Sequence, residues 1–148
     1  MLKGINPLLR GELLKVLDEM GHGDQLLLVD RNYPSYASGK PVIEVAIPSI
    51  LEVAEAIFEV FPLDSFLKHP LEKMEVDQDP TKSNPVQDAL LKQARVEHQP
   101  DPEHGVLEYG VVPRMEVYER AKSVFAVVRT LETAPYCVFF LHKGIITT

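Results

Sequence analysis

The feature that most constrains this chain is the short apolar run Gln25–Val29, which stands between two groups of turn-forming residues. A continuous run of this length, bounded by turn signals, is typical of a strand that is buried on both faces. Before it, Glu12–Met20 carries apolar residues at helical spacing, and we expect Gly21 to stop that helix. After it, Asn32 and Pro34 predict a turn. The chain therefore begins as a helix followed by a buried strand.

The same alternation continues along the 148 residues. Ser49–Glu52 has the pattern of a capping box before a helix that ends at Pro62, and Asn84–Gln87 has the signature of a second helix start. Further helix is expected after Pro113, with loops at 77–83 and 99–105. The remaining predicted strands are 42–46, 71–76, 106–112, 124–128 and 138–141, with residues 132–135 turning between the last two. This order predicts an α/β fold, a single three-layer domain over 1–148 with a mixed β-sheet and helices on its faces.

Composition narrows the class of protein. The formal net charge of -7 argues against nucleic acid and anionic membranes as partners, and no apolar run is long enough for a membrane span. The first residues lack the apolar stretch of a signal peptide, and Cys137 is the single cysteine. We therefore expect a cytoplasmic protein without an internal disulfide.

The sequence gives little support for a nucleotide-binding site or a metal-binding site. The glycine patterns of phosphate-binding loops are missing. The histidines and acidic residues that might bind a metal have no recognised ligand spacing, so we expect no metal site. These residues are His22, Asp24, Asp30, His98 and His104. Cys137 begins an apolar strand and is interpreted as a small buried hydrophobic residue.

General acid/base chemistry suits the polar residues better. His22 lies between two glycines, so its imidazole is presented from a turn, and Asp30 stands where the first strand ends. Ligands of α/β sheets gather at strand ends, which suggests that His22 and Asp30 converge on one cleft. A purely structural interpretation is equally compatible with the spacing: Gly21 caps the helix before His22, and Asp30 closes a turn.

Two further segments offer sugar-binding groups. Arg114 and Tyr118 share one helix face and could donate to the oxygens of a polyol, and the ring of Tyr136 could stack on a sugar. The structural alternatives are a surface ion pair for Arg114 and aromatic residues at the edge of the core for Tyr118 and Tyr136.

Taken together, these stretches resemble the family of L-fucose mutarotases and D-ribose pyranases, nearly from end to end. The residues that carry the resemblance are Glu12–Leu17, Met20–Asp24, Asp30–Pro34, Leu63–Ser65, Arg114–Phe125, Ala134–Tyr136 and Lys143-Gly144. Tyr118–Lys122 is similar to the fucose branch rather than the ribose branch.

The resemblance implies interconversion of the α and β anomers of a monosaccharide without a cofactor. It implies that His22 is the general acid/base, that Asp30 and Arg114 bind sugar hydroxyls, and that Tyr136, Cys137 and Val138 line the pocket. It also implies a ring-shaped homo-oligomer, decameric in fucose mutarotases, in which a neighbouring subunit completes each site.

One departure from the family pattern bears on the substrate. Val138 stands where the family usually has asparagine, and Leu131 replaces the glycine of a Thr-Gly-Glu turn. A valine cannot make the hydrogen bonds of an amide, so the identity of the sugar is open. A non-catalytic sugar-binding protein on the same scaffold is the main alternative, whereas D-ribose pyranase activity is disfavoured by Tyr118–Arg120.

Overall fold

A mixed six-stranded sheet forms the centre of the computed structural model, which describes residues 1–148. The strand order is β2-β5-β1-β6-β3-β4. β6 is antiparallel to both of its neighbours, and all other neighbouring strands are parallel. The strands are β1 (Gln25–Val29), β2 (Val42–Glu44), β3 (Leu71–Met74), β4 (Gly110–Val112), β5 (Ala126–Arg129) and β6 (Val138–His142).

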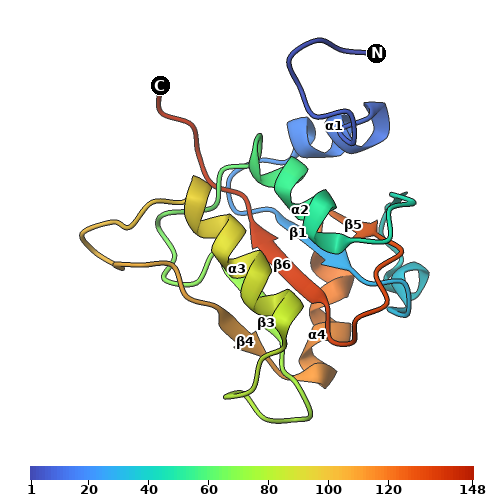
Figure 1. Cartoon of the computed structure of the whole chain (residues 1–148), viewed down its shortest axis with the longest axis vertical. Helices are drawn as coiled ribbons and strands as arrows, with labels where there is room; N and C mark the ends of the chain where they lie inside the picture. Colours follow the sequence, from blue (N-terminus) through green and yellow to red (C-terminus); the bar gives the residue numbers. More distant parts are fainter.

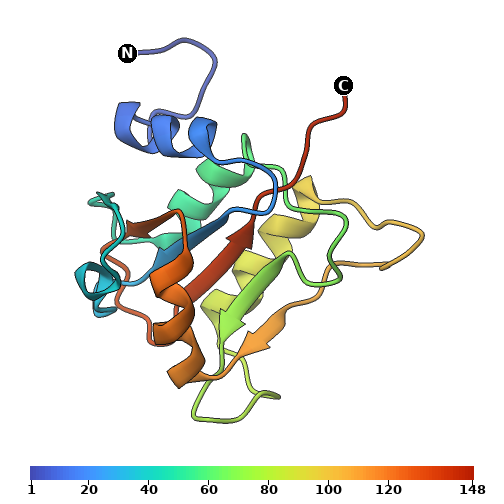
Figure 2. The same cartoon turned by 180° about the vertical axis from the view of Figure 1, so that it is seen from behind.

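Helices cover both faces of this sheet (Figures 1 and 2), so the predicted α/β class with a mixed sheet is confirmed. α1, α2 and α3 lie on one face, and α4 lies on the other. The helices are α1 (Gly11–Glu19), α2 (Ile50–Phe58), α3 (Pro85–Glu97) and α4 (Arg114–Arg120), with 3-10 turns at Ser35–Ser38 and Ala121–Ser123. None of them has the length and apolar character needed to cross a membrane.

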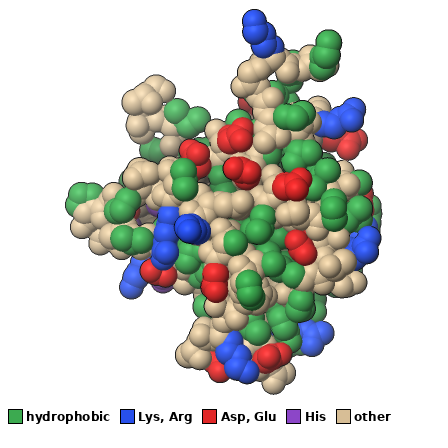
Figure 3. Space-filling model, in the orientation of Figure 1, with side chains coloured by type: hydrophobic (Ala, Val, Ile, Leu, Met, Phe, Trp, Pro, Cys, Tyr) green, Lys and Arg blue, Asp and Glu red, His purple; other side chains and the backbone are tan.

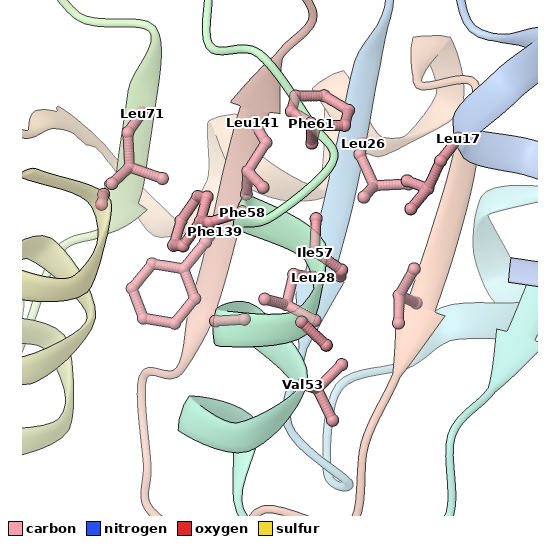
Figure 4. Close-up of a cluster of buried hydrophobic side chains, with 14 of the residues drawn as sticks. Leu17, Leu26, Leu28, Val53, Ile57, Phe58, Phe61, Leu71, Phe139 and Leu141 are labelled. Carbon is pink, nitrogen blue, oxygen red and sulfur yellow. The ribbon is translucent and has the colours of Figure 1, made fainter. Parts of the chain in front are cut away.

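The central strand β1 is buried on both faces, as its uninterrupted apolar sequence predicts. Leu26 and Leu28 pack into a cluster of 24 buried residues shared with α1, α2 and α3 (Figure 4). Leu27 and Val29 point the other way, into a second cluster of 11 buried residues that includes α4. Because alternate side chains of a strand face opposite sides, a strand with this sequence needs an apolar layer on each side.

The two strongest helix-start signals are confirmed in atomic detail. The Ser49 hydroxyl accepts a hydrogen bond from the Glu52 amide at 3.4 Å, and the Asn84 side chain accepts one from the Gln87 amide at 2.9 Å. The outer face of α2 is acidic, and Figure 3 shows acidic side chains gathered over the upper half of this side of the molecule.

Several expected details differ from the structure. α1 ends at Glu19 with Met20 in an extended conformation, so Gly21 is not a left-handed cap; its amide instead donates to Asp24 at 2.8 Å. The strands expected at 42–46, 71–76 and 106–112 are shorter in the structure and span 42–44, 71–74 and 110–112.

The last two strands, β5 and β6, are consecutive in sequence but are not neighbours in the sheet. β1 lies between them, parallel to β5 and antiparallel to β6. The segment between them crosses the end of β1, where the Arg31 amide donates to the Glu132 carbonyl at 3.0 Å. The turn predicted at 132–135 is therefore a crossover past the end of β1, which lies between β5 and β6 in the sheet.

The strand directions define two edges of the sheet. The carboxyl ends of β1–β5 and the start of β6 lie at one edge, which we call the carboxyl edge. The opposite edge, here the amino edge, holds the starts of β1–β5 and the end of β6. Both chain termini lie on the amino-edge side of the molecule (Figure 2).

A charged cluster at the amino edge ties α4 to the sheet. The Glu72 carboxylate of β3 accepts hydrogen bonds from the Arg120 guanidinium at 2.6 and 2.9 Å and contacts the His142 imidazole of β6. Arg120 also lies 4.3 Å from the centre of the Phe140 ring. Burial alone would raise the pKa of Glu72, but hydrogen bonds from His142 and Arg120 lower it from 4.5 to about 2.

This cluster predicts a pH-dependent contribution to stability. Because the folded pKa of Glu72 lies below its unfolded value, the contribution is complete above pH 4.5 and is lost as the pH falls toward about 2. We expect Glu72→Gln to lower the free energy of unfolding by about 3 kcal/mol at pH 7. The difference from the wild type should shrink in denaturant titrations between pH 5 and pH 2.

The matched control is Glu108→Gln, since Glu108 also pairs with an arginine, Arg95 at 2.6 Å, but its side chain is 65% exposed. This variant is expected to change the free energy of unfolding by less than about 1 kcal/mol at any pH. Parallel stability curves for wild type and Glu72→Gln over the acid range would contradict the assignment.

Candidate functional site

Asp30 follows β1 at the carboxyl edge and is only 5% exposed. Its Oδ1 accepts hydrogen bonds from the amides of Asn32 at 2.9 Å and Tyr33 at 3.1 Å, and its Oδ2 accepts one from the Cys137 amide at 3.2 Å. Since a carboxylate offers about four acceptor positions, one position on Oδ2 remains for a ligand. Burial raises the pKa of Asp30 above its ordinary value, while these amide contacts oppose the shift.

Arg114 and two tyrosines lie at the same edge. The Tyr33 and Tyr118 rings are stacked with their centres 5.9 Å apart, and the Arg114 Nε donates to the Tyr118 hydroxyl at 3.1 Å. Arg114 is exposed and forms no salt bridge, so the ion-pair interpretation does not describe it. Tyr118 does pack against the α4 core cluster, so it has the structural role as well as an accessible hydroxyl.

Tyr136 completes the polar rim of this edge. Its hydroxyl donates to Asp77 Oδ1 at 2.7 Å, and this hydrogen bond raises the pKa of the phenol. The residue adopts a left-handed backbone conformation with φ of 59°. Only Asp77 and Gln78 share this feature among the non-glycine residues, and both follow β3 at the carboxyl edge. Backbone strain of this kind gathers at functional sites, so its presence here draws attention to this edge.

The next two residues of the segment are present at the edge but their side chains are not open to solvent. Cys137 is 0% exposed and packs on the α1–α3 side, whereas Val138 is 2% exposed and packs on the α4 side. Burial raises the pKa of the Cys137 thiol to about 12, so it stays protonated at neutral pH. Cys137 contributes its backbone amide to Asp30, and Val138 forms an apolar floor beneath the rim.

His22 lies at the amino edge, in the turn between α1 and β1. Its Nε2 is 3.1 Å from Asp64 Oδ2, and its ring centre is 5.6 Å from that of Phe66. The imidazole is 48% exposed, while the Asp64 side chain is only 5% exposed. A buried carboxylate therefore orients a half-exposed imidazole, which suits a group that exchanges protons with a bound molecule.

Asp64 is a candidate functional residue for which the sequence analysis gave no role, although Leu63–Ser65 belongs to the resemblance. Its amide donates to the His142 carbonyl at 3.0 Å, and its Oδ1 accepts from the Phe66 amide at 3.0 Å. Asp64 and His22 are 42 positions apart, so local spacing cannot pair them.

The expected convergence of His22 and Asp30 does not occur within one chain. The two residues flank β1 at its opposite ends, and the five residues of that strand alone span roughly 15 Å. The physical reason is that β1 is straight and fully paired, so the turn before it and the turn after it lie at opposite edges. The structure instead presents two half-sites: Asp30, Arg114 and Tyr136 at one edge, and His22 with Asp64 at the other.

Of the other candidate positions, His98 lies near Asp64: burial lowers the pKa of His98, and the charges of Asp101 and Asp64 oppose this shift. No group of three or more His, Cys, Asp or Glu side chains is arranged to hold a metal ion. His104 lies 3.5 Å from Asp101 in the 99–105 loop. A cavity of about 710 Å³ lies between the N-terminal segment and β2, and none of the candidate residues lines it.

The fold defines an α/β protein with a mixed sheet, and its candidate ligand-binding residues lie at the carboxyl ends of the parallel strands, where α/β proteins commonly bind ligands. The model of the RbsD / FucU transport protein family matches residues 3–146, and the chain belongs to this family. The family resemblance seen in the sequence is thereby confirmed.

Named relatives are similar over nearly their whole length. The L-fucose mutarotase of Actinobacillus pleuropneumoniae is 34% identical over 98% of this chain and 97% of its own. The human fucose mutarotase is 35% identical over 98% of this chain and 94% of its own. The crystal structure of the Streptococcus pneumoniae fucose mutarotase in complex with L-fucose is 32% identical, covers 99% of this chain and 100% of its own, and has a TM-score of 0.83.

Packing around Asp64 yields a stability prediction. A Cβ on Gly144 would lie 2.6 Å from the Leu63 carbonyl oxygen and 2.9 Å from the Asp64 Cα, both of which are backbone atoms. We expect Gly144→Ala to lower the free energy of unfolding by about 1–3 kcal/mol, since backbone must move to admit the methyl group. Gly11→Ala is the control, because nothing lies within 4 Å of that position. Equal denaturation midpoints for the two variants would contradict the close approach.

Proposed function

We propose that this protein is a mutarotase that interconverts the α and β anomers of a reducing monosaccharide, with L-fucose as the leading candidate. The observation that carries the proposal is the half-exposed imidazole of His22 held by the buried carboxylate of Asp64. Membership of the RbsD / FucU family and the names of the relatives support the reaction and the sugar.

The proposed chemistry needs only proton transfer. A base removes the proton of the anomeric hydroxyl and an acid protonates the ring oxygen, so that the C1–O5 bond breaks and the open-chain aldehyde forms. Rotation of the aldehyde and reversal of both proton transfers gives the other anomer. Positioned acid/base catalysis contributes about 10²–10⁴-fold, which is sufficient for a reaction that already proceeds in water. The proposal therefore requires no cofactor.

Asp64 determines which nitrogen of His22 takes part. A carboxylate beside Nε2 favours the tautomer with its proton on that atom, which leaves the lone pair on Nδ1 as the proton acceptor. At the other half-site, Asp30 accepts from a sugar hydroxyl through its remaining position, Arg114 donates to sugar oxygens, and the Tyr136 ring covers one face of the sugar.

The separation of the half-sites supports assembly of each site from two subunits. In this arrangement the amino edge of one copy, with His22, docks on the carboxyl edge of the next, and such a head-to-tail contact closes into a ring. Exposed apolar side chains are present at both edges: Phe66 is 64% exposed beside His22, and Met115 is 76% exposed beside Arg114. The ring, decameric by family resemblance, belongs to the proposal, as does a cytoplasmic location.

A non-catalytic sugar-binding protein is the second candidate, and Val138 is the observation that favours it. With a buried valine at the start of β6, the floor of the carboxyl-edge half-site lacks the amide that the family usually places there. This protein would bind sugar without accelerating anomer exchange.

The first test is exchange NMR on the α and β anomers of L-fucose, with D-ribose and D-galactose as comparison sugars. His22→Ala is expected to lower the protein-dependent exchange rate by about 10²-fold or more while retaining sugar binding. His69→Ala serves as the control, because the partly exposed His69 lies outside both half-sites and its ring bonds only to the Glu108 carbonyl. Binding by the wild type without faster exchange would favour the second candidate.

The second test asks whether two copies share one site. His22→Ala and Asp30→Ala chains are each expected to be inactive alone, because every site in either assembly lacks one group. When the two are unfolded together and refolded in equal amounts, about one quarter of the sites should contain both native residues. Recovery of about a quarter of wild-type exchange supports the shared site. No recovery from a folded mixed assembly contradicts it.

A further inference from the structure

The proposed reaction gives no role to a buried hydrogen-bond network that lies behind the carboxyl edge. It consists of Lys73 on β3 and Gln87 on α3, which are 4% and 0% exposed. Lysine and glutamine are seldom buried to this extent without a specific partner. The network ends at Tyr136, which is the aromatic residue of the carboxyl-edge half-site.

The contacts of Lys73 fix the orientation of Gln87. The Lys73 ammonium donates to Gln87 Oε1 at 3.0 Å and to the Lys82 carbonyl at 2.7 Å, and it forms no salt bridge with a carboxylate. Because an ammonium only donates, the amide of Gln87 must turn its oxygen toward Lys73 and its nitrogen away. Burial lowers the pKa of Lys73, as expected for an ammonium held mainly by neutral carbonyls.

The Gln87 nitrogen then holds the backbone of the sugar half-site. Its Nε2 donates to the Tyr136 carbonyl at 2.9 Å and to the Met74 carbonyl at 3.1 Å. In the same first turn of α3, the Asn84 side chain donates to the Pro135 carbonyl at 2.9 Å. The two carbonyls that flank the strained Tyr136 backbone are therefore both fixed by α3.

The far end of Tyr136 is fixed by the 77–83 loop. Its hydroxyl donates to Asp77, and the same loop is tied to Lys73 through the Lys82 carbonyl. The backbone carbonyl of Tyr136 is thus connected to the Lys73 ammonium through Gln87, and its hydroxyl is connected to the same ammonium through the 77–83 loop. A left-handed conformation costs a non-glycine residue about 1–3 kcal/mol and persists only where its surroundings hold it.

We propose that Lys73 and Gln87 are positioning residues that act on the sugar through Tyr136. Asp77 is the third member and holds the phenolic hydroxyl, so that the ring is fixed before the sugar arrives. This inference rests on the proposed function for the nature of the ligand. It extends that function by naming residues outside both half-sites that determine sugar affinity.

The double variant Lys73→Met with Gln87→Met separates positioning from stability. Replacing both side chains together by apolar ones of similar length leaves no unpaired charge in the core. The carbonyls of Lys82, Met74 and Tyr136 lose a donor, so the variant is expected to fold with a lowered denaturation midpoint. It should raise the KM for L-fucose by about tenfold and change kcat by less than about twofold, because a positioned binding platform acts on ground state and transition state alike.

Tyr36→Phe is the matched control for Tyr136→Phe. The Tyr36 hydroxyl also donates to a carboxylate, Glu44 at 2.8 Å, but this pair is exposed and lies near β2, outside both half-sites. Tyr36→Phe should leave KM unchanged. A double-mutant cycle of Asp77→Ala with Tyr136→Phe should be strongly non-additive, since removing the hydroxyl removes the contact through which Asp77 acts.

Two readouts in the sugar-free and sugar-bound protein do not depend on turnover. The ring resonance of ¹³C-labelled Tyr136 should shift or broaden in the Met double variant, and the dissociation constant for L-fucose should rise by the same factor as KM. A folded double variant with an unchanged ring resonance and unchanged affinity overturns the proposal. If the wild type accelerates no anomer exchange, the proposed function fails, and the ring resonance still decides the role of Lys73 and Gln87.

Discussion

The structure depends on the burial of β1 from both sides. From Leu26 to Val29 every side chain of this strand is apolar and buried, so polar groups can lie only at its two ends, because a polar side chain between them would lose its hydrogen bonds to water. In this chain those ends hold His22 and Asp30, and the strand between them is straight and paired with β5 and β6. The same constraint that places the apolar core thus separates His22 from Asp30, and it is the structural basis for proposing that a site is assembled from two copies.

Local signals in the sequence predicted most helices and strands well, but they could not predict which strands pair in the sheet. Gln25–Val29 is a strand at its predicted bounds, and the caps at Ser49 and Asn84 form as expected, because each depends on residues within one turn. The order of β5, β1 and β6 depends on pairing between distant segments, which no single segment reveals. The turn at 132–135 therefore gave no indication that β1 lies between the last two strands, and His22 and Asp30 were expected to converge.

The candidate site shows the same division. His22, Asp30, Arg114 and Tyr136 carry recognisable chemistry and were identified from residue type and position. Asp64 was missed as the partner of His22 because it lies on the loop between α2 and β3 and reaches His22 only when Gly144 packs against that loop. Likewise, a lysine within the short strand β3 offers no indication in the sequence that it orients a glutamine from a helix.

The position of Val138 in the fold explains why an apolar residue is tolerated there. Its side chain lies under the rim on the α4 side, in the core cluster that contains Tyr33 and, at its margin, Tyr118 and Tyr136. An amide at this position would need hydrogen-bond partners within an apolar cluster, whereas valine needs none. Under the proposed function, polar recognition of the sugar then depends on Asp30, which is held by backbone amides, and on Tyr136, which is held by the Lys73–Gln87 network. Because Val138 offers no polar group of its own, the proposal places more weight on how rigidly these neighbouring groups are held.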